Sequence, residues 1–227
     1  MIPQISLCLL TWNEIQGCQQ VIPNLPQNLF TEVFALDGGS TDGTVQYLSA
    51  AGITVVPQVK RSYNAAYIEA IDHYSGDGIV FYHPKGTVDE ASLPLVHAEL
   101  ASGRDLVVAS RMLPASKNEE DDQLIRHRKW FGQGLALAAS LRWNRRGVAR
   151  ISDPLHGYRG CSRAFTDSLR LRPSGVTADL EMVQHAYASG ASVAEIPVDE
   201  SERQVGGTHF PAWKTGKALM RYLIMSS

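Results

Sequence analysis

The first half of the chain alternates short apolar runs with stretches of helical pattern. Short, mostly apolar runs of strand length, which are typical of strands buried on both faces, cover residues 5–10, 33–36, 52–56, 79–82 and 105–109. Helical patterns separate them, from residue 15 to Pro23 or Pro26, from a helix start at the end of residues 37–44, over 65–73 and over 91–101. This alternation with short links predicts an α/β fold with a mostly parallel sheet flanked by helices.

The rhythm changes beyond Ser110. Residues 118–122 form an acidic run that reads as a solvated loop, and a Gly- and Ala-rich helix follows, ending near residues 143–147. Further on, the pattern predicts a helix over 180–189, a strand over 192–198 and a last helix over 213–225. There is no internal repeat or low-complexity linker. We therefore expect one domain over residues 1–227.

Composition narrows the function classes. The 227 residues are 44% hydrophobic and 19% charged, as in an ordinary globular protein, and the net charge of −2 gives no global attraction to nucleic acid. No apolar stretch approaches the roughly 20 residues of a membrane span, and the start lacks a secretory pattern. Cys8, Cys18 and Cys161 are widely spaced. They predict reduced thiols in a cytoplasmic protein and argue against a zinc site.

Polar segments follow three of the predicted strands, at residues 11–14, 37–44 and 83–87. Ligands of open α/β sheets bind beyond the carboxyl ends of the strands. A carboxylate there, such as Asp37, can accept a hydrogen bond from a nucleobase or a ribose hydroxyl, and the glycines after it let the backbone approach the ligand. A tight strand-to-helix turn explains residues 37–40 equally well, so this segment alone leaves both interpretations open.

Five segments in order carry a more specific signal. "LLTWNE" and "LDGGSTDGT" resemble the P-T-Y-N-E and D-D-G-S-T-D-G-T segments of the family 2 glycosyltransferases. "DLVVASRMLP" looks like D-h-V-I-G-S-R (h, apolar), and "SDPLHGYRGCSRAF" looks like S-D-P-x-S-G-F-R-x-x-S-R. "ASVAEIPVDESERQVGGTH" resembles E-V-P-V followed by R-x-x-G-x-S-K. The pattern is most similar to the dolichyl-phosphate mannosyltransferase-like enzymes, which transfer a sugar from a nucleotide diphosphate to a polyprenyl phosphate.

The resemblance implies a GT-A fold, with a nucleotide-sugar-binding half at 1–110 and an acceptor-binding half with the last helix at 111–227. Asp37 would read the base, and Arg111 would anchor the fold beside the acceptor cleft. The other implied contacts of the nucleotide and its phosphates come from Thr11, Asn13, Glu14, Arg61, Arg203 and His209. The loop that carries Arg203 ends in Thr208-His209 where relatives have Ser-Lys.

The chain departs from the family at "YHPKG". Relatives carry Asp-x-Asp at His83-Pro84-Lys85, two carboxylates for the Mg²⁺ or Mn²⁺ that is usual in the family, and Asp89 supplies only one late carboxylate. Lys85 would repel such a cation. Three interpretations remain: Lys85 acts as a fixed positive charge at the diphosphate in metal-independent transfer, with His83 beside the donor; the protein binds nucleotide without transfer; or both are ordinary loop residues.

The acceptor is less well determined. A sugar hydroxyl needs a general base, which Asp179 in "TADLEMV" would supply. A lipid phosphate needs no base, and Arg126, Arg128 and Lys129 lie where the lipid-phosphate relatives keep cations. Asp179 is equally explained as a carboxylate at a helix N-terminus.

Residues 126–146 combine cations and tryptophans with an apolar middle, a composition typical of a helix at a lipid interface. A core helix with a basic end has the same composition. The last helix would pack beside it or form a homodimer contact.

We expect an inverting glycosyltransferase that uses a UDP- or GDP-linked sugar and acts on a polyprenyl phosphate or a glycan, in the cytoplasm or at the inner face of the membrane. The alternative is a catalytically silent nucleotide-sugar-binding homologue. A nucleotidyltransferase is disfavoured because no Gly-rich basic phosphate loop follows the first strand. Nucleic acid is not an expected partner.

Overall fold

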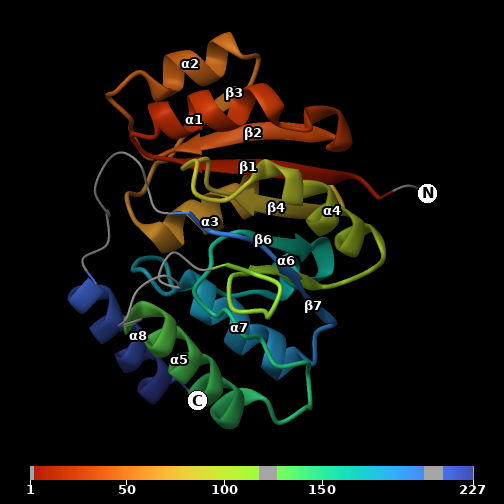
Figure 1. Cartoon of the computed structure of the whole chain (residues 1–227), viewed down its shortest axis with the longest axis vertical. Helices are drawn as coiled ribbons and strands as arrows, with labels where there is room; N and C mark the ends of the chain where they lie inside the picture. Colours follow the sequence, from red (N-terminus) through yellow and green to blue (C-terminus); the bar gives the residue numbers. More distant parts are fainter. Residues whose placement is uncertain (1–2, 118–126, 202–211, 227) are drawn as a thin grey trace.

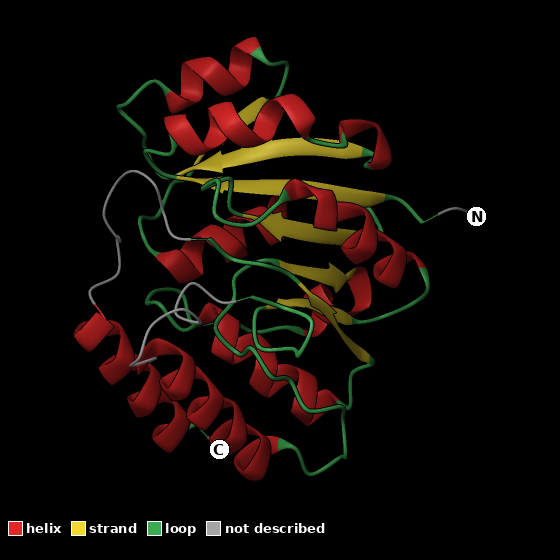
Figure 2. Cartoon of the chain, in the orientation of Figure 1, coloured by secondary structure: helices red, strands yellow, loops and turns green. Residues whose placement is uncertain are grey.

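A seven-stranded sheet in the order β3-β2-β1-β4-β6-β5-β7 forms the centre of the computed structural model, which describes residues 3–117, 127–201 and 212–226 (Figures 1 and 2). The strands are β1 (Ile5–Thr11), β2 (Glu32–Asp37), β3 (Thr54–Pro57), β4 (Gly78–Tyr82), β5 (Leu106–Ser110), β6 (Arg159–Ser162) and β7 (Val193–Pro197). Only β6 runs antiparallel to its neighbours. The sheet is therefore mostly parallel, as the apolar runs predict.

Helices cover both faces because alternate residues of the central strands face two different cores. In β1, Cys8 and Leu10 belong to one core while Leu7 and Leu9 belong to the other. The Leu7 core also contains residues of α1 (Ile15–Val21), α2 (Thr44–Ala50) and α4 (Leu93–Ala101). The Cys8 core contains residues of α3 (Tyr63–His73), α5 (His127–Trp143), α6 (Arg163–Ser168), α7 (Ala178–Ser189) and α8 (Ala212–Met225). Short 3-10 turns cover Ile22–Asn24, Gln27–Leu29 and Glu90–Ser92.

The six predicted strands are all present, with ends that move by one or two residues. The predicted helices are present too, although the first ends at Val21 before its prolines. Two elements were not predicted, β6 and α6, which follow one another in the chain. β6 reads Arg-Gly-Cys-Ser, and so short a polar segment carries no apolar run from which a strand could be recognised.

Arg159 explains why this polar strand lies in the middle of the sheet. Its side chain is fully buried, and its guanidinium donates to the carbonyls of His156 (Nε, 2.8 Å), Asp179 (Nη1, 2.7 Å) and Pro154 (Nη2, 2.8 Å). One side chain thus ties the loop before β6 to the first turn of α7. All three hydrogen bonds of this buried cation go to backbone carbonyls, and losing them would leave buried polar groups unsatisfied, which is costly.

We predict that Arg159→Met lowers the free energy of unfolding by about 3 kcal/mol, since three buried carbonyls lose their donors at once. Urea denaturation followed by circular dichroism measures it. The matched control is Arg170→Met on an exposed arginine nearby, which should cost less than about 1 kcal/mol. Equal losses in the two variants would show that Arg159 does not hold this region together.

Candidate active site

The loops after β1, β2 and β4 meet at one edge of the sheet, because parallel strands in register end together. Thr11 pairs with Asp37, and Leu9 with Tyr82, the last residue of β4. A cavity of about 390 Å³, called cavity A here, opens at this edge, and Thr11, Gly38 and His83 line it. Sequence reasoning thus placed three segments together, and the structure brings them together.

Asp37 holds the turn that follows β2. Its Oδ2 accepts from the amides of Gly39 (2.8 Å) and Ser40 (2.7 Å), and its Oδ1 from the hydroxyls of Thr11 (3.0 Å) and Ser40 (2.5 Å). Asn13, at φ 52°, fixes the same turn by accepting from the Thr41 amide at 2.8 Å. Neither side chain is among those that line cavity A. Base recognition by Asp37 and nucleotide contact by Asn13 remain predictions.

Three other predicted residues do line cavity A, namely Thr11, Glu14 and Arg61. Arg61 is exposed and lies over the glycine turn, where a Cβ added at Gly39 would be 2.5 Å from its Nη2. A guanidinium at that place faces any ligand that enters over the strand ends. The glycine therefore allows a cation to approach the backbone closely.

The loop after β4 is pressed against α1. A Cβ added at Gly17 would lie 2.2 Å from the Pro84 carbonyl oxygen and 2.8 Å from the Lys85 Cα, so only glycine fits there. The Lys85 amide donates to the His83 carbonyl at 2.8 Å, which closes the loop tightly. Lys85 and His83 line cavity A and also a second cavity of about 200 Å³, called cavity B. The two residues that depart from the family pattern thus stand where the cavities adjoin.

His83 is a neutral imidazole at physiological pH. Burial first, and then the neighbouring charge of Lys85, keep its pKa well below the usual value. Lys85 therefore contributes positive charge at this loop, and His83 does not.

The donor set of this loop does not fit the divalent cation that family resemblance implies. Mg²⁺ and Mn²⁺ take oxygen ligands, whereas His83 and Lys85 offer a neutral imidazole and an ammonium. Within residues 3–117, 127–201 and 212–226, no group of three or more His, Cys, Asp and Glu side chains is placed to hold a metal ion.

Cavity B contains the carboxylate of Asp179, in the first turn of α7. Its Oδ2 accepts from the Tyr63 hydroxyl at 2.8 Å, while its buried Oδ1 has no hydrogen-bond partner and lies 3.8 Å from Arg159 Nε. Burial raises the pKa of Asp179, against the opposing effects of Arg159 and Tyr63. A half-satisfied carboxylate with a raised pKa, facing a cavity, has the properties of a general base.

A chain of hydroxyls joins Asp179 to His83. The Tyr63 and Tyr67 hydroxyls lie 3.0 Å apart, and the Tyr67 hydroxyl lies 3.3 Å from His83 Nε2. Gly157 makes room for it, since an added Cβ would be 2.6 Å from all three polar atoms. The two tyrosines are four residues apart on α3. This spacing in the sequence predicts that they share a helix face, but it does not predict that they reach a site.

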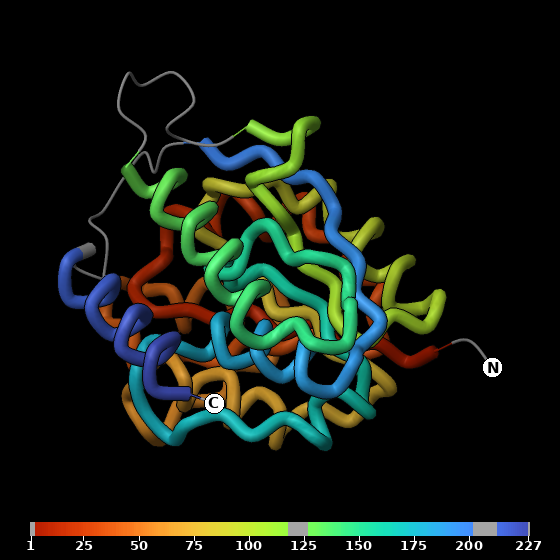
Figure 3. Tube along the Cα trace, turned by 90° about the horizontal axis from the view of Figure 1, so that it is seen from below, coloured from red at the N-terminus to blue at the C-terminus, as the bar shows by residue number. Residues whose placement is uncertain are grey.

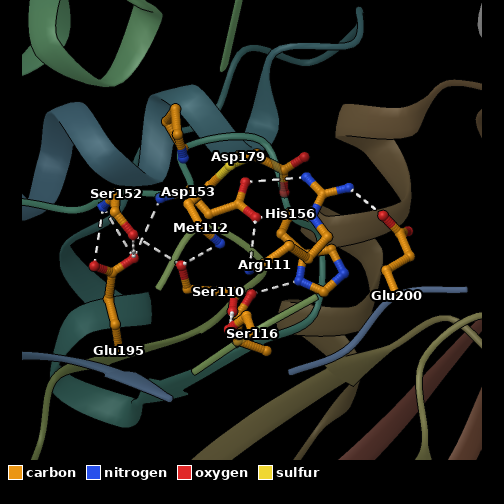
Figure 4. A network of polar contacts seen from close by, with 12 residues as sticks. Ser110, Arg111, Met112, Ser116, Ser152, Asp153, His156, Asp179, Glu195 and Glu200 are labelled. Carbon is orange, nitrogen blue, oxygen red and sulfur yellow. Dashed lines mark hydrogen bonds and ion pairs between the residues drawn. The ribbon is translucent and has the colours of Figure 1, made fainter. Parts of the chain in front are cut away.

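Arg111 also lines cavity B, and Figure 4 shows its ion pairs with Asp153 and Glu200. Its guanidinium forms a two-point ion pair with Asp153 (2.8 and 3.0 Å) and a third bond to Glu200 at 2.7 Å. The Arg111 charge holds the pKa of Asp153 far below its usual value despite burial. All its charge-assisted bonds go to protein carboxylates, so Arg111 shapes the cavity.

His156 was not predicted, although it stands where the family pattern S-D-P-x-S-G-F-R has Ser. Its Nδ1 bonds to the Ala109 carbonyl at 2.5 Å and must carry the proton, because a carbonyl only accepts. Burial and then the Arg111 charge lower its pKa to about 4. The ring is therefore neutral, with Nε2 as an acceptor, and His156 is among the residues that line cavity B.

The remaining predicted residues lie elsewhere. Arg126, Arg203 and His209 fall outside the described residues. Arg128 is exposed in the first turn of α5 and lines neither cavity.

Residues 6–169 match the family model of glycosyl transferase family 2. The chain belongs to this family. A glycosyltransferase of Haloferax volcanii, AglJ, is 26% identical over 210 residues, which are 88% of this chain and 65% of the relative. The chain thus spans just under two thirds of the length of the curated relative that it matches.

Solved structures with the same fold include glucosyl-3-phosphoglycerate synthase from Mycobacterium tuberculosis. The complex of that protein with Mg²⁺ and UDP has a TM-score of 0.74 at 18% identity, covering 98% of this chain and 78% of that one. Its complex with Mn²⁺, UDP and glucosyl-3-phosphoglycerate has a TM-score of 0.71 at 20% identity, with 98% and 77% covered. The likeness confirms the predicted GT-A fold.

We predict that acid weakens the fold through His156. The unfolded chain takes up this proton near the usual pKa of 6.5 and the folded chain only near 4, so stability is complete above 6.5 and is lost as the pH falls toward 4. Between pH 7 and pH 5 this histidine should account for about 2 kcal/mol. Its charged surroundings are Arg111, Asp153 and Glu200.

His156→Asn keeps a donor for the Ala109 carbonyl and removes the titration. Urea midpoints at the two pH values should therefore differ less in this variant than in the parent chain. Parallel pH dependence of the two proteins would contradict the assignment.

Proposed function

We propose that the chain is a glycosyltransferase that binds a nucleoside diphosphate sugar in cavity A and transfers the sugar, with inversion, to an acceptor in cavity B. The single observation that carries the proposal is that Lys85 lines both cavities. It therefore stands where a leaving diphosphate would separate from the sugar. Cavity A draws nearly all its lining from residues before 110, in line with a donor-binding first half.

Charge balance supports a donor of this class. Among the described residues, two lysine or arginine side chains line cavity A, Arg61 and Lys85. Together they carry two positive charges, the same charge as one divalent ion. Fixed cations stabilise a departing diphosphate without reorganisation. UDP in the M. tuberculosis complexes favours a UDP-linked sugar over a GDP-linked one.

The acceptor is a polyprenyl phosphate or a glycan hydroxyl, and the two make different demands on cavity B. A phosphate is already anionic and needs no base, whereas a hydroxyl must lose its proton as the bond to the anomeric carbon forms. Asp179 lines the same cavity, and its Oδ1 accepts no hydrogen bond from the described residues, so this carboxylate is the group that would take that proton. The motif pattern favours the lipid phosphate, and the state of Asp179 favours the hydroxyl.

We predict that Lys85→Ala weakens binding of a UDP-sugar by about 100-fold, the scale of a lost charge-assisted contact, while EDTA leaves binding by the parent chain unchanged. Isothermal titration calorimetry measures both, with the exposed Lys117→Ala as control. Gly17→Ala, which displaces the loop without removing charge, should reproduce the loss, and Gly134→Ala, in open space, should not. Loss of binding on chelation in the parent chain would refute the fixed-charge idea.

A reciprocal variant sharpens this test. His83→Asp with Lys85→Asp recreates Asp-x-Asp, so donor binding should appear only with added Mn²⁺. Metal-independent binding by that variant would mean that this loop does not face the diphosphate.

We predict that Asp179→Asn leaves donor affinity within about twofold but slows transfer to a glycan hydroxyl by at least about 100-fold, because the base is lost. Transfer to an undecaprenyl phosphate analogue should fall less than about tenfold. Radiolabelled transfer assays on both acceptors, with NMR of the product anomer, give the comparison. Tight donor binding with no turnover on either acceptor would instead identify a nucleotide-sugar-binding protein without catalysis.

A further inference from the structure

Helices α5 and α8 lie side by side and run in the same direction at one end of the molecule (Figures 1 and 3). Near their starts, a Cβ added at Gly216 would be 3.8 Å from the Phe131 ring. Near their ends, the Arg142 guanidinium donates to the carbonyls of Ile224 (3.0 Å) and Ser226 (3.0 Å). Contacts at both ends fix the pair as parallel and nearly level.

The outer face of α5 carries an exposed apolar stripe. Leu135, Ala139 and Trp143 are buried in the core, and the opposite side presents Trp130, Leu137 and Leu141 at spacings of seven and four residues, which places them on one helix face. They are 56%, 47% and 79% exposed.

The outer face of α8 repeats this arrangement. Leu219, Tyr222 and Leu223 are buried, while Trp213, Met220 and Ile224, with the same spacings, are 80%, 40% and 65% exposed. Because the helices are parallel, level and packed on one core, the two stripes face the same side in register. Trp213 stands near the level of Trp130, and Ile224 near that of Leu141. We call these six side chains the α5–α8 face.

Counted over lysine, arginine, aspartate and glutamate, the charged side chains within α5 and α8 are all positive. The two helices contain six lysines and arginines and no aspartate or glutamate, although the whole chain has a net charge of −2. The six cations are Arg128, Lys129, Arg142, Lys214, Lys217 and Arg221. Long cationic side chains beside an apolar stripe with tryptophans are the composition of helices that lie in the plane of an anionic membrane surface.

We propose that the α5–α8 face docks this protein on an anionic lipid bilayer, with both helix axes parallel to the membrane. Docking is peripheral: no helix in the described parts of the chain is long and apolar enough to cross a bilayer. A second copy of the chain fits the face less well, because a two-fold contact would bring like charges together. The inference stands on this surface and does not require the proposed reaction.

Where the proposed function also holds, docking gives cavity B a geometric relation to the membrane. Thr215 and Leu219, on the inner side of α8, line that cavity. Cavity B then lies one helix diameter, about 10 Å, from the lipid surface. A polyprenyl phosphate headgroup at the membrane has only this distance to cover.

Flotation with lipid vesicles tests the proposal on the full chain. The protein should float with phosphatidylcholine vesicles that contain phosphatidylglycerol and not with phosphatidylcholine alone, and salt should weaken the binding. Lys217→Glu and Arg221→Glu should each weaken it at least about fivefold, and Leu137→Glu with Ile224→Glu should abolish it. The matched controls are Val59→Glu and Leu95→Glu, at exposed apolar positions elsewhere (84% and 52%).

Absence of flotation by the parent chain would overturn the proposal, and so would equal losses in the control variants. Light scattering tests the alternative that the face binds a second copy of the chain. A dimer in lipid-free buffer that Leu137→Glu dissociates would show this. Donor titration on the same variants keeps this result separate from the proposed function, because the α5–α8 face should not affect nucleotide affinity. Unchanged melting temperatures establish that each variant is folded.

Discussion

The close approach of two backbones, at Gly17 of α1 and at Pro84–Lys85 after β4, is the constraint on which the site depends. A side chain at Gly17 would occupy the space of the Pro84 carbonyl, so the helix and the loop can be this close only with glycine there. The contact fixes the Lys85 backbone between two cavities. A flexible lysine side chain needs such a fixed base to act as a localised charge, since its own rotamers do not hold it.

Two buried arginines with different roles shape the second half of the site. Arg111 joins Asp153 to Glu200, and Arg159 gathers three backbone carbonyls around the start of α7. Buried ion pairs repay little more than the cost of removing their charges from water, so stability alone does not account for them. Their effect is geometric: they hold the walls of cavity B while Asp179 Oδ1 remains without a hydrogen bond. An unsatisfied carboxylate persists only where its surroundings are rigid.

The fold was largely predictable because its central strands are buried on both faces, which leaves unbroken apolar runs such as residues 79–82. β6 escaped prediction because a buried arginine, whose guanidinium donates to three backbone carbonyls, replaces the apolar side chain expected there. In the site, Lys85 could be singled out because it breaks a motif. Three other residues could not be singled out, because each matters through a contact with a residue far away in the chain. Tyr63 contacts Asp179, 116 positions away, Gly17 contacts Pro84, 67 positions away, and His156 contacts Ala109, 47 positions away.

A fixed ammonium and a bound metal ion are not equivalent ways to meet a diphosphate. A metal ion brings two charges to one point and carries exchangeable ligands, whereas Arg61 and Lys85 bring one charge each from separate segments of the chain that line cavity A. His83 does not add a third, because burial keeps it neutral. Its neutrality has a use: a protonated ring beside Lys85 would repel the ammonium, and a neutral ring does not. The replacement of Asp-x-Asp by His-Pro-Lys is thus explained only if both changes are taken together: His83 is a buried, uncharged ring, and Lys85 next to it is a cation.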